Sequence, residues 1–277
     1  PGSTGTQDIT SSGFGTPDAV LFIWCGAASI VTAGTPIGTY ASVGFGAAAR
    51  RDGSQALWVG ISENGADPSD TASYCRMGSC VAGFDSGIDT VNAEASVTSY
   101  ITDGVQVTWG EVSGVARHYY AVFLKGCAAT IQSFLTRADT VTDIVVPAGF
   151  LIRGGMVVSA CKAEDSAGAL SVENQDSIGC FTDGSRGMIS QFAVGSRDED
   201  ALATTSSQGF SNYTAIYGNM GTSDALVGLG SATRVTTDLT MRMTDADPSA
   251  AFGGAFMLGD EAPVFDGGGA DHFRRRV

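Results

Sequence analysis

Residues 102–109 read Thr-Asp-Gly-Val-Gln-Val-Thr-Trp and combine a tight-turn signal with strict alternation of apolar and polar side chains. The Asp-Gly pair supplies the positive φ angles that two-residue β-hairpins need. Because side chains in a strand point alternately to opposite faces, Val105, Val107 and Trp109 share one face and the residues between them face water. This pattern predicts a half-exposed strand of a β-sandwich.

The composition of the whole chain favours the same class of fold. Its 277 residues include 38 Gly, and Asp+Glu outnumber Lys+Arg by 29 to 15. Asp and Gly are typical of turns, whereas Lys, a good helix former, occurs only at Lys125 and Lys162. We therefore expect an all-β protein with many short strands. The net charge of −14 argues against nucleic acid or a membrane surface as a partner.

Three motifs, one of which is the stretch 102–109, occur twice and in the same order along the chain. Each consists of a turn signal followed by an apolar strand, and the third is followed by a second apolar strand. In the first match, Gly13-Phe14 followed by 20–25 corresponds to Gly149-Phe150 followed by 156–161. In the second, Asp52-Gly53-Ser54 followed by 56–59 corresponds to Asp183-Gly184-Ser185 followed by 187–190. In the third, Thr102-Asp103 followed by 105–109 and 121–124 corresponds to Thr237-Asp238 followed by 239–243 and 255–258. This alignment places Cys25 with Cys161 and Trp58 with Ile189.

The repeated order predicts an internal duplication. We expect two consecutive antiparallel β-sandwich domains of jelly-roll or Ig-like type, at residues 1–130 and 131–261, followed by a flexible C-terminal arm at 262–277. The uniformly apolar runs 20–24 and 119–124 predict central strands that are covered on both faces. The uncharged stretch 19–49 is interrupted by Gly and Pro, which favours two buried strands and a loop over a membrane span.

Residues for nucleophilic catalysis are few. The chain has two histidines: we expect His118 to lie on the surface at a strand edge and His272 to lie in the mobile arm. Most Asp residues stand beside Gly, Ser or Thr in turns, so a pair of catalytic carboxylates is not favoured, and neither is a bound cofactor. The densest acidic clusters are at 197–200 and 245–247, and at most one of them could hold a structural Ca²⁺, near Asp198 and Asp200.

The cysteines and the aromatic residues leave two questions open. Cys75 and Cys80 are close enough in sequence to form a disulfide in an oxidising environment, although the composition favours reduced thiols. Four aromatic residues are candidates for stacking on sugars: Trp58, Trp109, Tyr40 and Tyr74. For Trp58 and Trp109, packing in the core is the better explanation.

Segments 13–24, 42–46, 102–109 and 119–126, with their Gly-Phe, Gly-Phe-Gly and Tyr-Tyr-Ala-Val-Phe-Leu-Lys-Gly motifs, resemble a family of tandem β-sandwich, virion-associated proteins of tailed bacteriophages. The second half departs from the pattern where Asp238-Leu239 stands in place of Asp103-Gly104. The resemblance implies a structural role in the virion and supplies no catalytic residues.

These observations together predict a non-enzymatic structural protein on the surface of a tailed-phage particle, either decorating or cementing the head or attached to the tail. It would be made in the cytoplasm of the bacterial host, form homo-oligomers and bind capsid or tail proteins. In the C-terminal arm, Phe265, Phe273, Arg274, Arg275 and Arg276 could anchor it to an acidic neighbour. The alternatives are a tail-fibre, receptor-binding or carbohydrate-binding module that recognises host surface glycans, and a glycosidase.

Overall fold

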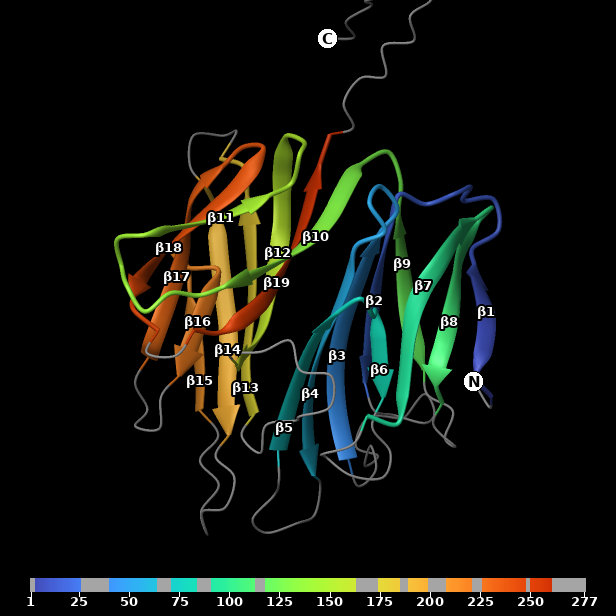
Figure 1. Ribbon diagram of the computed structural model, residues 1–277, viewed down its shortest axis with the longest axis horizontal. Coiled ribbons are helices and arrows are strands. Elements are labelled where there is room, and N and C mark those ends of the chain that lie inside the picture. Colours follow the sequence, from blue (N-terminus) through green and yellow to red (C-terminus); the bar gives the residue numbers. More distant parts are fainter. Residues whose placement is uncertain are drawn as a thin grey trace, which may run out of the picture.

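A computed structural model describes residues 3–25, 40–63, 71–83, 91–112, 118–162, 174–184, 189–198, 208–220, 226–247 and 250–260. These residues form strands, turns and bends, and none of them is helical. The strands pair into four sheets, and every pairing is antiparallel (Figure 1). The prediction of an all-β protein is confirmed.

The N-terminal strands form two of the sheets. The four-stranded sheet has the order β1 (Gly5–Thr10), β8 (Gly104–Glu111), β7 (Ala93–Ile101) and β6 (Val81–Gly83). The five-stranded sheet has the order β5 (Thr71–Met77), β4 (Gln55–Glu63), β3 (Tyr40–Ala49), β2 (Ala19–Cys25) and β9 (Tyr119–Leu124). We call β1–β9 the first half of the molecule.

The remaining strands, β10–β19, form the second half. Its four-stranded sheet has the order β11 (Asp143–Pro147), β18 (Asp238–Asp245), β17 (Leu226–Val235) and β16 (Tyr217–Met220). Its six-stranded sheet has the order β10 (Ala128–Leu135), β19 (Phe252–Gly259), β12 (Ile152–Lys162), β13 (Asn174–Thr182), β14 (Gln191–Asp198) and β15 (Gln208–Asn212).

The two halves have the same connectivity. When ten is added to each strand number of the first half, β1-β8-β7-β6 becomes β11-β18-β17-β16, and β5-β4-β3-β2-β9 becomes β15-β14-β13-β12-β19. The additional strand is β10, which joins the halves along the chain and pairs with β19. The boundary predicted at residues 130 and 131 falls within β10.

Each half encloses a hydrophobic cluster to which both of its sheets contribute, which gives a sandwich-like arrangement. In β8, Val105, Val107 and Trp109 are buried on the inner face, as the alternation in 102–109 predicted. In β18, Leu239, Met241 and Met243 form the corresponding buried row. The period-2 pattern therefore identified the inner faces of both four-stranded sheets.

In each half, one glycine allows the two sheets to approach each other closely. A Cβ atom on Gly46 of β3 would lie 1.7 Å from the carbonyl oxygen of Cys80, just before β6. A Cβ atom on Gly179 of β13 would lie 1.9 Å from the carbonyl oxygen of Ile216, just before β16. Since real atoms cannot approach so closely, only Gly fits at these two positions, and they lie on equivalent strands.

A glutamine at the start of β4 and another at the start of β14 compensate for irregular pairing in the opposite sheet. The ladder between β7 and β8 is irregular between Val97 and Ser99, and the backbone N–H of Val97 donates to Gln55 Oε1 at 2.8 Å. The β17–β18 ladder is irregular after Ala232, whose N–H donates to Gln191 Oε1 at 2.8 Å. Each glutamine thus satisfies a backbone donor at a bulge.

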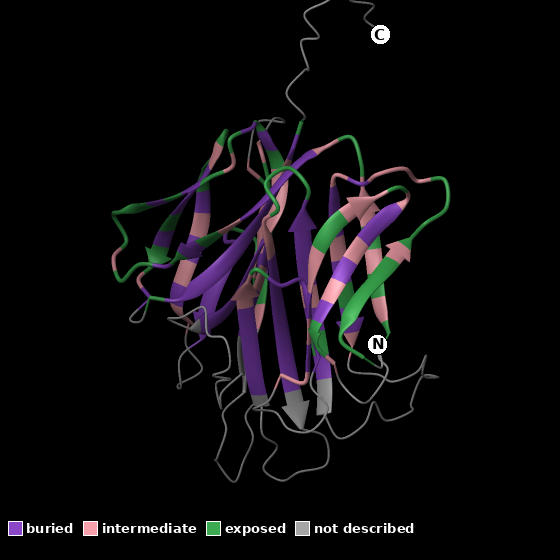
Figure 2. Ribbon diagram, turned by 45° about the vertical axis from the view of Figure 1, so that its right-hand side comes forward, coloured by how far each residue is buried: buried purple, intermediate pink, exposed green. Residues whose placement is uncertain are grey.

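The outer faces of the five-stranded and six-stranded sheets pack against each other, so the central layers of the molecule are the most buried (Figure 2). In β4, Leu57 and Val59 face the core of the first half, whereas Ala56 and Trp58 face the second half. The strands β4 and β19 are therefore buried on both sides, as are residues 72–75 of β5 and 157–161 of β12.

The prediction that 119–124 is covered on both faces is wrong. This segment is β9, the edge strand of its sheet, and Tyr120 and Val122 on its outer face are exposed. The prediction for 20–24 holds for the inner face of β2 but not for Ile23, whose side chain is also exposed. Apolar composition alone did not distinguish a strand that the other half covers from an edge strand whose outer face the other half does not reach.

The sheet registers also correct the alignment of the two halves. Phe22 pairs with Ala121 and Val157 pairs with Ala255, which places Cys25 with Ala160, one residue before Cys161. The β12–β19 ladder shifts between Ser159 and Lys162, and Cys161 has a φ of 53°.

The second correction concerns β4 and β14. Trp58 pairs with Phe45, and Val194 pairs with Ile178, so Trp58 corresponds to Val194 rather than to Ile189. The stretch 19–49 contributes β2 and β3, as predicted, and its residues 26–39 lie outside the described ranges. Among the described residues, no helix is long and apolar enough to span a bilayer.

Candidate functional site

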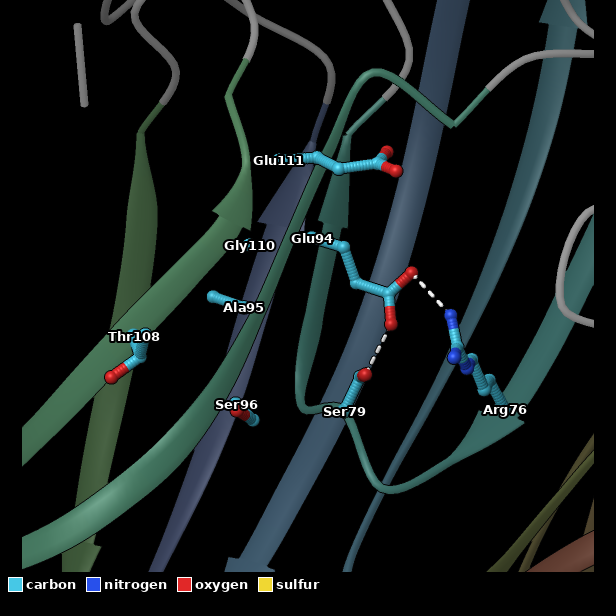
Figure 3. Close-up of a pocket in the computed structure, with 8 residues that line it drawn as sticks. All are labelled: Arg76, Ser79, Glu94, Ala95, Ser96, Thr108, Gly110 and Glu111. Atoms are coloured by element: carbon cyan, nitrogen blue, oxygen red, sulfur yellow. Dashed lines mark hydrogen bonds and ion pairs between the residues drawn. The ribbon is translucent and has the colours of Figure 1, made fainter. Parts of the chain in front are cut away.

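A pocket of about 270 Å³ lies at one end of the first half, where neighbouring side chains donate hydrogen bonds to the carboxylate of Glu94 (Figure 3). Arg76 Nη1 donates to Glu94 Oε2 at 2.7 Å, and the hydroxyl of Ser79 donates to Glu94 Oε1. The Tyr74 hydroxyl also donates to Glu94, at 3.4 Å. Glu111, which pairs with Glu94 across β7 and β8, lines the same pocket.

The electrostatics of this pocket favour a structural role, in which Glu94 connects neighbouring strands, over acid–base chemistry. Burial raises the pKa of Tyr74 to about 12, and a hydrogen bond to Tyr74 raises the pKa of Arg76. The phenol therefore stays protonated and the guanidinium stays charged at neutral pH. Both oxygens of Glu94 accept hydrogen bonds from β5 or from the segment that follows it, so this carboxylate joins the five-stranded sheet to β7.

A second carboxylate, Asp247, is fully buried in the second half. It accepts hydrogen bonds from the Tyr217 hydroxyl at 2.6 Å, from Thr136 Oγ1 at 3.2 Å and from Asn219 Nδ2 at 3.3 Å. Burial raises the pKa of Tyr217 and that of the nearby Cys161 thiol, so both groups stay protonated. The cluster connects β16 with the segments that follow β10 and β18, as buried polar networks commonly do.

The structure tests only some of the predicted site residues. The arm residues Phe265, Phe273, Arg274, Arg275 and Arg276 lie outside the described residues, as do His272 and Asp200. Asp198 ends β14, but its side chain is not described. Within the described ranges, no group of three or more His, Cys, Asp or Glu residues could hold a metal ion.

The other predicted residues fall into clear environments. His118 is exposed directly before β9, as expected for a strand-edge residue. Cys75 and Cys80 are not joined by a disulfide, and their side chains belong to different hydrophobic clusters. Trp58 and Trp109 are buried, which confirms core packing, and Tyr74 is buried as well. The side chain of Tyr40 is not described.

Trp58 lies at the centre of the interface between the halves. Its indole Nε1 donates to Asp176 Oδ1 at 3.0 Å in a buried hydrogen bond. Around this pair, Trp58 and Cys75 pack with Val158, Ala160 and Phe252.

Small residues continue this interface toward β10. A layer of alanines from β2, β3 and β4 packs on Ala129, Ile131 and Phe256. At the rim, the Arg51 guanidinium lies 5.0 Å from the centre of the Phe150 ring and donates to Gly149 O at 2.9 Å.

Each of the two interface sheets extends beyond the other and leaves part of its outer surface exposed. On the five-stranded sheet, we define face 1 as the exposed residues Ile23, Val43, Tyr120 and Val122, from β2, β3 and β9. Cross-strand pairing joins Ile23 directly to Tyr120. This face is uncharged and continues the surface that is buried between the halves.

On the six-stranded sheet, we define face 2 as Phe192 and Val194 of β14 together with Tyr213, which follows β15. Tyr213 is the most exposed large hydrophobic residue in the described chain, and its ring centre lies 5.6 Å from that of Phe192. Exposed apolar patches on sheets mark interaction sites. Sequence reasoning missed both faces, because their exposure depends on how far the two sheets overlap.

Comparisons with known proteins add no relative: no family model matches the chain, and no curated protein or solved structure matches it either.

Proposed function

We propose that the chain consists of two consecutive β-sandwich domains that arose by duplication, with the division near residue 130. The shared connectivity supports this proposal, and so do Gly46 with Gly179 and Gln55 with Gln191, which perform the same task at equivalent positions. Such agreement in detail is more than two unrelated sandwiches would share, because many strand orders satisfy the same packing rules.

The function that the geometry supports best is that of a non-enzymatic structural protein on the surface of a tailed-phage particle, bound to the head or to the tail. The observation that carries this proposal is the pair of uncharged faces on the five-stranded and six-stranded sheets, which are suited to binding neighbouring subunits. The conspicuous carboxylates, Glu94 and Asp247, are engaged in holding strands together. The likeness of the sequence to phage virion proteins points in the same direction.

The direct test is to find the chain in the particle. Virions of the phage that encodes it would be purified through two density gradients and analysed by quantitative mass spectrometry and immunogold labelling. We expect a fixed copy number per particle and labelling at the head or the tail. If the protein remains in the soluble lysate and is absent from washed particles, the proposal is wrong.

The C-terminal arm is a separate element of this proposal. A chain that ends at residue 261 lacks Phe265, Phe273 and the three terminal arginines. We expect lower occupancy on particles that are otherwise complete, because the arm would anchor the protein to an acidic neighbour. Occupancy equal to that of the full chain would show that attachment does not use the arm.

Glycan binding is the second candidate function, and the contact of the exposed Tyr213 ring with the half-buried Phe192 ring favours it. Aromatic rings with one open face can stack on sugars. In this case the purified protein would bind host polysaccharide on a glycan array, and Tyr213→Ala would abolish the signal. Strong particle association without any array signal would favour the structural role.

A further inference from the structure

We propose that this protein assembles head to tail with other copies of itself, face 2 of one copy packing on face 1 of the next in the arrangement that already joins its own two halves. The inference rests on the two-domain architecture proposed above, and it does not depend on a place in the virion. It names the partner, a second copy of the same chain, and the two surfaces that meet.

The sheet registers show which residues correspond in the two halves. Ile23 lies between Phe45 and Tyr120 in the five-stranded sheet, and Val158 lies between Ile178 and Gly254 in the six-stranded sheet. Two residues before Phe45 stands Val43, and two residues before Ile178 stands Asp176. In the next row, Val122 pairs with Leu21 and Phe256 pairs with Met156.

Face 1 therefore corresponds to the surface of the second half that is covered in the molecule. Val158 is 6% exposed and Phe256 is 4% exposed, because the first half packs on them. Their counterparts Ile23 and Val122 are 47% and 44% exposed. The same sheet surface is an interface in one half and open in the other.

The converse holds for face 2. Trp58, which packs on the second half, is 4% exposed, whereas its counterpart Val194 is 37% exposed. Ala56 pairs with Ala47 at the position where Phe192 pairs with Cys180. Tyr213 stands beside Phe192 as Met77 stands beside Ala56.

The interface between the halves is thus heterologous: the β4–β5 side of one sandwich packs on the β12–β13–β19 side of the other. A heterologous contact between two similar units uses one surface of each and leaves the complementary surface of each free. Face 1 and face 2 are these two remaining surfaces. Since each copy carries one of each, copies can join in series.

Compared with the interface between the two halves, the residues that would meet at the joint between two copies differ on both sides of the contact at once. In the molecule, Trp58 donates to Asp176, a polar pair that needs both members. At the corresponding positions of the joint, Val194 would face Val43, an apolar pair that needs no hydrogen bond.

At a second pair of contacting positions, the residues on both sides also differ between the interface of the halves and the proposed contact between copies. In the molecule, a Cβ atom on Gly254 would lie 3.6 Å from that of Ala56, so two small residues are in contact. In the joint, Tyr120 would face Phe192, two aromatic rings. No covalent connection fixes the distance between two copies, so these rings can set the spacing of the sheets.

Charge decides the conditions under which the joint forms. Each copy carries a net charge of −14, which repels other copies at low ionic strength, whereas the named residues of both faces are uncharged. Salt screens the repulsion and leaves apolar contact in place. Association should therefore strengthen as the NaCl concentration rises.

The test uses the purified full chain and two variants, each disabled at one face. The face 1 variant carries Ile23→Asp and Val122→Asp, and the face 2 variant carries Val194→Asp and Tyr213→Asp. The matched control, Val141→Asp, changes an exposed valine away from both faces. Mass is measured by sedimentation equilibrium over the micromolar range at low and high salt, and circular dichroism confirms that each variant is folded.

We expect the wild type and the control to form species of two or more copies, and each variant alone to be monomeric, because two carboxylates buried without partners weaken association by about a hundredfold or more. A one-to-one mixture of the two variants should form a dimer that does not grow, since one intact face remains on each partner. A monomeric wild type at high salt, a variant that still self-associates, or a mixture that stays monomeric would each overturn the proposal. Self-association in solution together with absence from virions would refute the virion role alone.

Discussion

The strands β4 and β14 hold equivalent places in the two halves, yet one is buried on both faces and the other on one. The outer residues of β4 are Ala56 and Trp58, small or able to fill a cavity, and they are covered by the second half. The outer residues of β14 are Phe192 and Val194, and they border open surface. The inner faces follow from the fold of each half alone, whereas the outer faces depend on how the halves overlap.

The largest effect is expected at the close approach of the sheets. Gly46→Ala places a Cβ atom against the Cys80 carbonyl, so the backbone of one sheet must move, at a cost of about 5 kcal/mol or more. If the halves are separate domains, hydrogen exchange measured by mass spectrometry will rise across β1–β9 and much less across β11–β19.

The matched variant is Gly179→Ala, which should reverse this pattern. Equal loss of protection in both halves for either variant would mean that the halves unfold as one unit, and the division near residue 130 would have no thermodynamic meaning. Gly110→Ala serves as a control for the substitution itself, because Gly110 is exposed on β8, its φ is not positive, and a Cβ atom there would meet no neighbour within 4 Å.

The second prediction compares the two equivalent outer positions directly. Trp58→Ala removes a buried indole and the donor to Asp176, and we expect the free energy of unfolding to fall by about 3–5 kcal/mol. Val194→Ala at the corresponding position should cost below about 1 kcal/mol in the monomer. Urea denaturation of both variants provides the measurement, and similar losses at the two positions would contradict the difference in coverage.

A third prediction concerns the shared glutamines. Gln55→Ala and Gln191→Ala each leave the backbone N–H at a bulge without its side-chain acceptor. We expect each change to cost about 1–2 kcal/mol and the two costs to be similar. Gln132→Ala, which removes an amide bonded to the hydroxyl of Thr130, is a control with a smaller effect. A large effect at one glutamine and none at the other would show that the resemblance between the bulges is superficial.

The smallest expected effect is a difference in pH dependence between the turns at Asp103 and Asp238. Gly15 N donates to Asp103 Oδ1 at 2.6 Å, and this bond holds the pKa of Asp103 below its ordinary value. A lowered pKa stabilises the folded state above the pKa of the unfolded chain, and the contribution is lost as the pH falls through the folded pKa. In the second half, Gly149 N donates instead to the backbone oxygen of Thr237.

Acid should therefore loosen the loop at Gly15 before it loosens the loop at Gly149. Amide exchange followed by NMR in the acidic range would reveal this order, and Asp103→Asn should abolish the pH dependence at Gly15. Identical pH profiles at the two glycines, with Asp103 intact, would show that the carboxylate does not hold the turn.

What the sequence could predict was local. Alternation at 102–109 located an inner face, and Asp-Gly at 52–53 located a turn in which Gly53 has a positive φ. The alignment of the halves slipped by one residue at Cys161 because a bulge inserts chain without any compositional signal. The hydrogen bond between Trp58 and Asp176 joins residues 118 positions apart, and no sequence pattern near either residue predicts it.

The strand β10 carries a consequence for how this chain is made. Its residues leave the ribosome well before those of its ladder partner β19, and Phe256 of β19 helps to cover the alanine-rich surface of the first half. That surface therefore stays exposed to water until β19 has been translated. Nascent chains that stall before β19 should be the ones that recruit chaperones and precipitate.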